Sequence, residues 1–109
     1  MSNECNIFSI LNDMSHPQIV KYITEQLTDA GEVIAKKMFG DYTLYCNGKV
    51  VGMICDDELY LKPLEVTRTF LRDILLKSPY PGAKPYYVIS DIDDRDYITM
   101  LVRTTADKL

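Results

Sequence analysis

Apolar residues follow two different periods along this chain of 109 residues. Between residues 37 and 62, the segment KMFGDYTLYCNGKVVGMICDDELYLK has the two-residue alternation and the turn residues of consecutive β-strands. Asn47-Gly48 is its strongest hairpin signal, because both residues tolerate the positive φ angles of a type I′ turn. A second turn falls at residues 56–58. The pattern predicts a three-stranded antiparallel meander, preceded by an opening strand at 33–39 and a bend at Gly40-Asp41.

The hairpin turn also predicts which side chains share a face of the sheet. An uninterrupted register places Tyr45 opposite Val50 and continues along both strands. The first face then contains Tyr42, Leu44, Cys46, Val51, Met53, Cys55 and Tyr60, and the second contains Thr43, Tyr45, Val50, Ile54, Leu59 and Leu61. Both faces are largely apolar, so we expect the second face to be covered by helices or by the N-terminal segment. The alternative is an exposed apolar patch that binds a partner or a second copy.

A period of three to four residues predicts helices on both sides of the meander. They cover residues 5–14, 16–31 and 64–76, and a last helix follows the acidic stretch 91–94. Ser15 is the expected cap of the second helix, with Gln18 completing a capping box. A loop at 78–82 and a short strand at 86–89 separate the last two helices. We therefore divide the chain into a helical N-terminal extension, residues 1–16, and one domain, residues 17–109.

The composition fits one packed globular core, because 47% of the residues are hydrophobic. Twelve Lys and Arg face sixteen Asp and Glu, which gives a net charge of −4. This balance disfavours nucleic acid as the primary partner, since the surface as a whole does not attract phosphates. The N-terminus lacks a basic region followed by an apolar core, and no apolar run approaches about 18 residues. We expect a cytoplasmic protein without a membrane partner.

The residues predict no catalytic, metal or cofactor site, and hence no enzyme. Cys46 and Cys55 lie roughly 20 Å apart at opposite ends of the predicted hairpin, too far for a disulfide, so we expect reduced thiols. His16 is the single histidine and is expected at the surface of a helix start. The carboxylates at 91–96 suit helix capping, and those at 56–58 suit a solvated turn. No phosphate-binding glycine pattern surrounds Gly82.

Basic and aromatic side chains are the best candidates for partner contact. Two arginines lie one turn apart on the predicted helix 64–76, and lysines and tyrosines flank it. The candidate contact residues are Lys62, Arg68, Arg72, Tyr80 and Lys84. The alternative is an ordinary solvated helix face, on which Glu65 and Asp73 balance the arginines.

Several segments together resemble the N-terminal domain of the TfoX/Sxy proteins, bacterial regulators of competence for DNA uptake. The segments are Gly31-Glu32-Val33, Lys37-Met38-Phe39-Gly40, Tyr42-Thr43-Leu44-Tyr45, Asn47-Gly48-Lys49, Asp56-Asp57-Glu58-Leu59-Tyr60-Leu61-Lys62, Thr67-Arg68 and Tyr80-Pro81-Gly82-Ala83-Lys84-Pro85. Their order and spacing extend the resemblance over residues 17 to 108. No single motif among them is specific.

The resemblance implies a small α+β domain, with helices flanking an antiparallel sheet, in transcriptional co-regulators that are not enzymes. Full-length members continue into a helical C-terminal domain. The sequence given ends at Leu109, so we do not expect roles that depend on that domain to transfer. The extension up to Met14 is a second departure from the family pattern. The resemblance carries no catalytic residues.

Three functional hypotheses follow. The first is a non-enzymatic regulatory or protein-interaction domain that contacts a protein partner, such as the transcription machinery, and forms a homo-oligomer. The second is a nucleic-acid-binding module that uses the local basic patch together with Lys36 and Lys37. The third is a small-ligand pocket or minor enzyme between the sheet and a helix, which requires a cavity lined by convergent polar groups.

Overall fold

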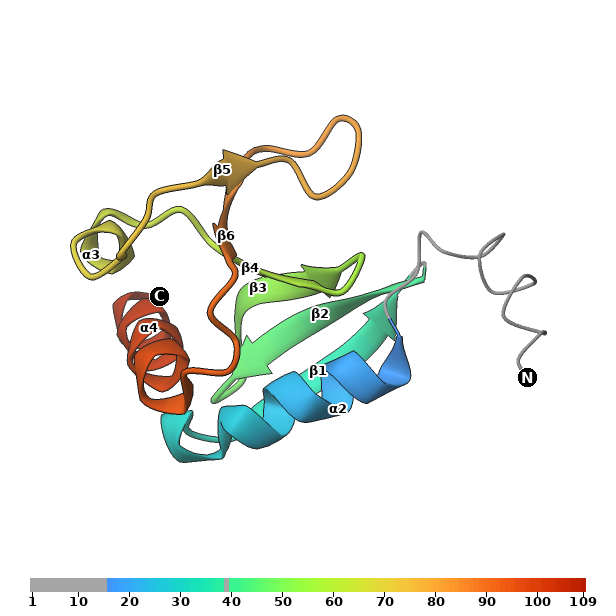
Figure 1. The fold of residues 1–109 in the computed structure, drawn as a ribbon, viewed down its shortest axis with the longest axis horizontal. Helices are drawn as coiled ribbons and strands as arrows, with labels where there is room; N and C mark the ends of the chain where they lie inside the picture. The colour runs from blue at the N-terminus through green and yellow to red at the C-terminus, as the bar shows by residue number, and fades with distance from the viewer. Residues whose placement is uncertain (1–15, 39) are drawn as a thin grey trace.

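The computed structural model describes residues 16–38 and 40–109, which form an open antiparallel sheet of six strands with helices against it (Figure 1). The strands are β1 Val33–Met38, β2 Asp41–Cys46, β3 Lys49–Cys55, β4 Glu58–Leu61, β5 Leu76–Lys77 and β6 Tyr86–Ile89. The helices are α2 Pro17–Gln26, the short 3₁₀ turn η1 Thr28–Ala30, α3 Glu65–Arg68 and α4 Arg95–Lys108. The strand order is β1-β2-β3-β4-β6-β5. The predicted α+β class and the β2-β3-β4 meander are confirmed, whereas the predicted helix 5–14 and the Ser15 cap lie outside the described residues.

The core lies between one face of the sheet and the helices α2 and α4 (Figure 1). Both helices contribute to a single apolar cluster, as the periodicity of their sequences predicts. Fully buried members of this cluster are Ile23 and Leu27 near α2, Leu44, Cys46, Val51, Ile54, Leu59 and Leu61 on the sheet, and Ile98, Leu101 and Val102 on α4. The helices therefore cover the same face, and the opposite face receives neither of them.

A β-bulge in the β2-β3 hairpin overturns part of the predicted face assignment. Tyr45 does pair with Val50, but Leu44 pairs with Gly52, so that Val51 is an extra residue on β3. One extra residue moves every later side chain to the other face of the sheet. The predicted faces are therefore wrong beyond the bulge: Ile54, Leu59 and Leu61 lie in the core, while Met53, Cys55 and Tyr60 lie on the opposite face.

Gly52 explains why the bulge is located here. A Cβ atom at this position would lie 1.9 Å from the backbone oxygen of Tyr60 on the adjacent strand β4. Only glycine permits such a close approach of two strands, and glycine within a strand commonly marks a bulge.

The predicted helix 64–76 is largely wrong, because α3 contains only four residues and ends at Arg68. β-branched residues weaken the helix propensity of this segment. In addition, the Thr69 hydroxyl donates to the Val66 carbonyl at 2.8 Å, and this side-chain hydrogen bond competes with the backbone hydrogen bond that would continue the helix. Downstream, Leu76 and Lys77 form β5 and pair with the edge of β6. Of the apolar residues that suggested a helical stripe, Val66 lies in α3, Leu71 packs against the core, and Ile74 and Leu75 are exposed in the chain just before β5.

The helix predicted at 16–31 ends as an α-helix at Gln26 and continues only as the 3₁₀ turn η1, whereas the two predicted turns and the predicted last helix are confirmed. Asn47 and Gly48 have φ angles of 54° and 83°, as a type I′ turn requires, and Asp56 and Asp57 form the second tight turn with φ angles of 53° and 63°. The last helix α4 begins at an N-cap, Asp94, whose carboxylate accepts a hydrogen bond from the Tyr97 amide at 3.2 Å. The second and third cysteines of the chain are buried and not disulfide-bonded.

Candidate functional site

The sheet face opposite α2 and α4, here called the open face, is the main candidate for a binding surface. In the part of the chain that the structure describes, no helix packs on it, so the helices are not the cover that the sequence favoured. The predicted N-terminal cover lies outside the described residues. The connection between β5 and β6 shields part of the open face, where the Cys55 thiol donates to the Pro79 carbonyl at 3.1 Å. Tyr60 and Val88 are buried beside this contact, and Met53 is half-buried.

A hollow of about 620 Å³ opens on this face. Its lining is mostly apolar and aromatic: Met38, Asp41, Tyr42, Thr43, Val50, Gly52, Met53, Tyr80 and Tyr86. Two of the lining side chains, Met38 and Tyr80, are 51% and 52% exposed. An exposed hollow lined by apolar and aromatic side chains is typical of a binding site.

A second hollow of about 460 Å³ continues the first toward two lysines. Tyr80 and Tyr86 line both hollows, and Lys62 and Lys84 line the second one. Neither lysine forms an ion pair with the described residues. We call the two hollows together the open-face groove, which has an apolar end at Met38 and a cationic end at the lysines.

Three of the five predicted contact residues, Lys62, Tyr80 and Lys84, are thus brought together by the fold. The two arginines are not part of this group. Arg68 lies 4.0 Å from the Glu65 carboxylate, as the solvated-face alternative anticipated.

Arg72 is held by contacts within the protein and is therefore not free to contact a partner. Its guanidinium bonds the Asp94 carboxylate at 2.6 Å, lies 3.6 Å from the Asp91 carboxylate, and stacks 4.0 Å from the centre of the Tyr97 ring. This hydrogen bond holds the pKa of the Asp94 carboxyl below its usual value. Arg72 therefore fixes the start of α4.

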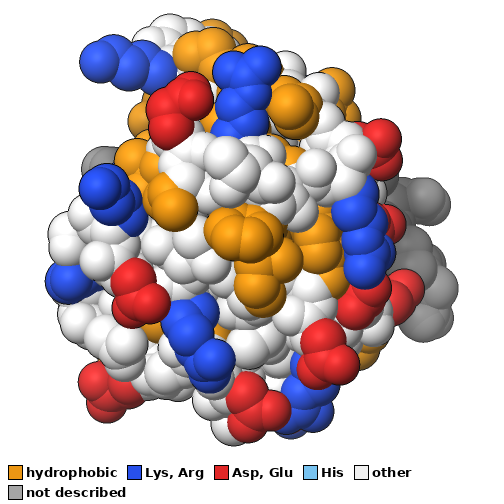
Figure 2. Space-filling model, turned by 90° about the vertical axis from the view of Figure 1, so that its left-hand side faces the viewer, with side chains coloured by type: hydrophobic (Ala, Val, Ile, Leu, Met, Phe, Trp, Pro, Cys, Tyr) orange, Lys and Arg blue, Asp and Glu red, His pale blue; other side chains and the backbone are white. Residues whose placement is uncertain are grey.

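The face seen from the side of α3 and α4 carries Lys and Arg side chains interspersed with Asp and Glu side chains (Figure 2). Because both signs alternate, this face offers no single basic stripe for a phosphate backbone. The nucleic-acid hypothesis therefore finds no support on this side of the molecule.

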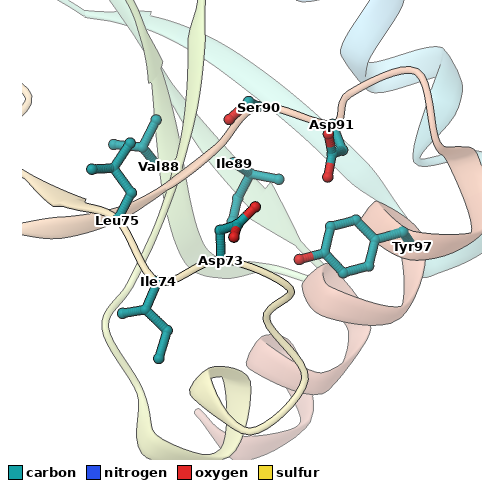
Figure 3. A pocket seen from close by; sticks show the side chains of 8 residues that line it. All are labelled: Asp73, Ile74, Leu75, Val88, Ile89, Ser90, Asp91 and Tyr97. Atoms are coloured by element: carbon teal, nitrogen blue, oxygen red, sulfur yellow. The ribbon is translucent and has the colours of Figure 1, made fainter.

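A smaller pocket of about 350 Å³ lies between β6 and the chain that leads into β5 (Figure 3). Asp73, Asp91, Ser90 and the Tyr97 hydroxyl surround it, above an apolar floor that includes Ile89. The Tyr97 hydroxyl accepts a hydrogen bond from the Arg72 amide at 2.9 Å. These groups hold the α3-β5 connection against α4, and they do not pair a nucleophile with a general base.

The thiols and the histidine of the described chain are placed for structure rather than reaction. Burial, followed by a hydrogen bond with Asp41, raises the pKa of the Cys55 thiol to about 12, so the thiolate is absent at neutral pH. The His16 amide and ring bond the Asp57 carboxylate at 2.7 and 2.6 Å, which ties the start of α2 to the β3-β4 turn. Sequence reasoning did not connect these two residues, which are 41 positions apart.

No group of three or more His, Cys, Asp or Glu side chains suited to a metal ion occurs in residues 16–38 and 40–109. Over the same residues, each helix is too short or too polar to cross a membrane. Sequence reasoning noted Tyr86 as part of an aromatic contact surface but missed the groove residues Met38 and Met53. The signal that would have found Met53 is Gly52, since a glycine within a strand indicates a bulge and hence a change of face.

Comparison with known proteins identifies the family to which this chain is similar. The profile of the TfoX N-terminal domain matches residues 25–108, a range that includes the whole groove. A protein of Spirochaeta aurantia described as an uncharacterized 12.7 kDa protein in the trpE 5′ region is 37% identical over 89 residues. The aligned region covers 81% of this chain and 77% of that protein.

Proposed function

Because this chain belongs to the TfoX N-terminal domain family, we propose that it is a non-enzymatic regulatory domain that acts by binding another protein through the open-face groove. In this proposal the chain is a bacterial, cytoplasmic co-regulator of transcription related to competence control. The observation that carries the proposal is the groove itself: an apolar and aromatic channel on a sheet face that none of the described helices covers.

The groove also favours a particular kind of partner. Its apolar end accommodates aliphatic or aromatic side chains, and its other end places Lys62 and Lys84 at the rim. Charge complementarity across an interface selects the partner and accelerates association. The proposed ligand is therefore a protein segment in which apolar residues are followed by Asp or Glu.

Competing functions have weaker support in the described residues. A small-ligand site between the sheet and the helices requires a cavity, but the side chains there form one buried apolar cluster. A nucleic acid would use the tyrosines and lysines of the open face, against a net charge of −4. The experiment below separates this alternative from the protein partner.

The test begins with selection of short peptides from a displayed random library on the immobilised chain. We expect enrichment of apolar residues flanked by Asp or Glu, and amide chemical-shift changes that map to the groove. The variant Lys62→Glu/Lys84→Glu should weaken binding of a selected peptide by more than tenfold. The matched control is Lys21→Glu/Lys108→Glu, which makes the same charge change at exposed positions of α2 and α4 and should bind normally.

Two outcomes would reject the proposal. One is a selected peptide that maps to α2, α4 or another surface and ignores the groove variant. The other is binding of a single-stranded oligonucleotide or a DNA duplex, rather than peptide, with an affinity that falls steeply as salt rises and is lost in Lys62→Glu/Lys84→Glu.

A further inference from the structure

Three consecutive large apolar side chains are exposed at one edge of the sheet. Ile74, Leu75 and Leu76 are 51%, 52% and 51% exposed, and they lead into and form β5, the outermost strand beyond β6 (Figure 1). Natural proteins usually protect an edge strand with charges, proline or a covering segment, because its unpaired backbone groups pair readily with another strand. Here the edge carries an unbroken apolar run.

The backbone of this edge is oriented for further pairing. The Val88 amide donates to the Leu75 carbonyl at 2.9 Å, and Leu76 lies opposite Tyr87. Hydrogen-bonded and non-bonded residues alternate along an antiparallel ladder. The peptide groups of Leu75 therefore face β6, and those of Leu76 face outward, away from the sheet.

We propose that β5 is the surface through which two copies of this chain pair, antiparallel to each other, about a two-fold axis at Leu75. The segment Asp73-Ile74-Leu75-Leu76-Lys77 is complementary to itself in this arrangement. Leu75 opposes Leu75 of the second copy, Ile74 opposes Leu76, and Asp73 comes to the level of Lys77. The outward-facing groups of Leu76 meet those of Ile74, which is the alternation that the ladder requires.

The symmetry of the segment is what favours a second copy over an unrelated protein. A two-fold interface uses the same patch on both subunits, so every contact must be self-complementary. Apolar residues at the centre and opposite charges at the two ends satisfy this condition, with Lys77, which pairs with Glu58 of its own chain at 3.2 Å, placed between two carboxylates. The pairing uses the sheet edge rather than the open face, so it stands or falls independently of the proposed function.

Sedimentation velocity of the full chain, from about 5 μM to about 500 μM, tests the dimer, since a short interface gives a concentration-dependent association. Ile74→Lys should shift the chain to monomer. Leu76→Pro should do the same, because it removes an outward amide without breaking the ladder to β6. The matched control is Ile34→Lys on β1, the opposite edge of the sheet, where the side chain is 44% exposed. Circular dichroism melts confirm that each variant is folded.

A cysteine scan tests the register. In a Cys5→Ser background, Leu75→Cys should form a disulfide-linked dimer on mild oxidation, because non-bonded residues that face each other across an antiparallel pair are about 4.5 Å apart at Cα. Leu76→Cys should link far less, since it faces Ile74 of the second copy. The buried native thiols Cys46 and Cys55 do not compete.

The proposal is overturned by a chain that remains monomeric at the highest concentration. It is equally overturned by a dimer that persists in Ile74→Lys and Leu76→Pro, or by cross-linking that is no stronger at position 75 than at position 76.

Discussion

A buried pair of threonine hydroxyls holds α3 against α4, and its removal should reveal which hydroxyl donates. Thr67 and Thr105 are both fully buried, and their oxygen atoms lie 2.6 Å apart. The Thr105 hydroxyl donates to the Leu101 carbonyl at 2.8 Å. A hydroxyl has one proton, so the proton between the two threonines must come from Thr67.

This assignment makes the two substitutions to valine unequal. Thr105→Val leaves the Thr67 donor buried without an acceptor, which costs roughly 2 kcal/mol of unfolding free energy. Thr67→Val leaves Thr105 donating to Leu101 and removes only the hydrogen bond that the Thr105 oxygen accepts, so the cost is about 0.5–1 kcal/mol. In a Thr105→Val background, Thr67→Val removes the orphaned donor and should be neutral or stabilising. The coupling energy of the pair is then at least about 0.5–1 kcal/mol.

Urea unfolding followed by far-UV circular dichroism measures the four proteins of this cycle, since the chain has no tryptophan. The control is Thr104→Val, a neighbour on α4 that is only partly buried, and it should change stability by less than about 0.5 kcal/mol. Equal costs for the two single variants, or costs that simply add in the double variant, would refute the assigned direction of the hydrogen bond.

Two further predictions concern the bulge and the start of α4. Gly52→Ala should lose about 3 kcal/mol, because the new Cβ meets the Tyr60 carbonyl at 1.9 Å, whereas Gly82→Ala, with nothing within 4 Å but a φ angle of 89°, should lose about 1 kcal/mol in urea unfolding. The pKa of Asp94 is lowered by Arg72, so its stabilisation is present above the unfolded pKa of about 3.9 and is lost as the pH falls through the lower folded value. Asp94→Asn keeps a capping oxygen and should flatten this acid limb; an unchanged acid limb between about pH 2 and 5 would contradict the assignment.

Elements set by local sequence could be predicted, and those set by distant partners could not. The turn at Asn47-Gly48 depends on the φ preferences of two residues, and α4 depends on its own periodicity and on the Asp94 cap. β5 depends instead on pairing with the distant edge of β6, and α3 ends early at Arg68 because β-branched residues and the Thr69–Val66 hydrogen bond weaken the helix there. A helical apolar pattern at 70–76 was therefore misleading, since tertiary pairing overrides local propensity.

The candidate site divides in the same way. Lys62, Tyr80 and Lys84 were predicted from their charge or aromatic character and their positions on either side of the predicted helix 64–76, and they do lie together because both flanking segments meet beside β6. Arg72 was predicted as a contact residue but bonds Asp94, which is 22 positions away. No sequence pattern indicates that two residues so far apart in the chain form an ion pair.

The bulge at Gly52 connects the fold to both proposals. Without the extra residue, Met53 and Tyr60 would turn toward the helices, and the open face would lose the apolar floor on which the groove depends. In the protein as it is, the proposed pairing through β5 extends the sheet in its own plane and does not cover the open face. The proposed dimer therefore leaves both grooves accessible on one continuous sheet. A partner with two acidic-apolar segments of sufficient spacing would bind both grooves at once, with the gain in affinity that an intramolecular second contact provides.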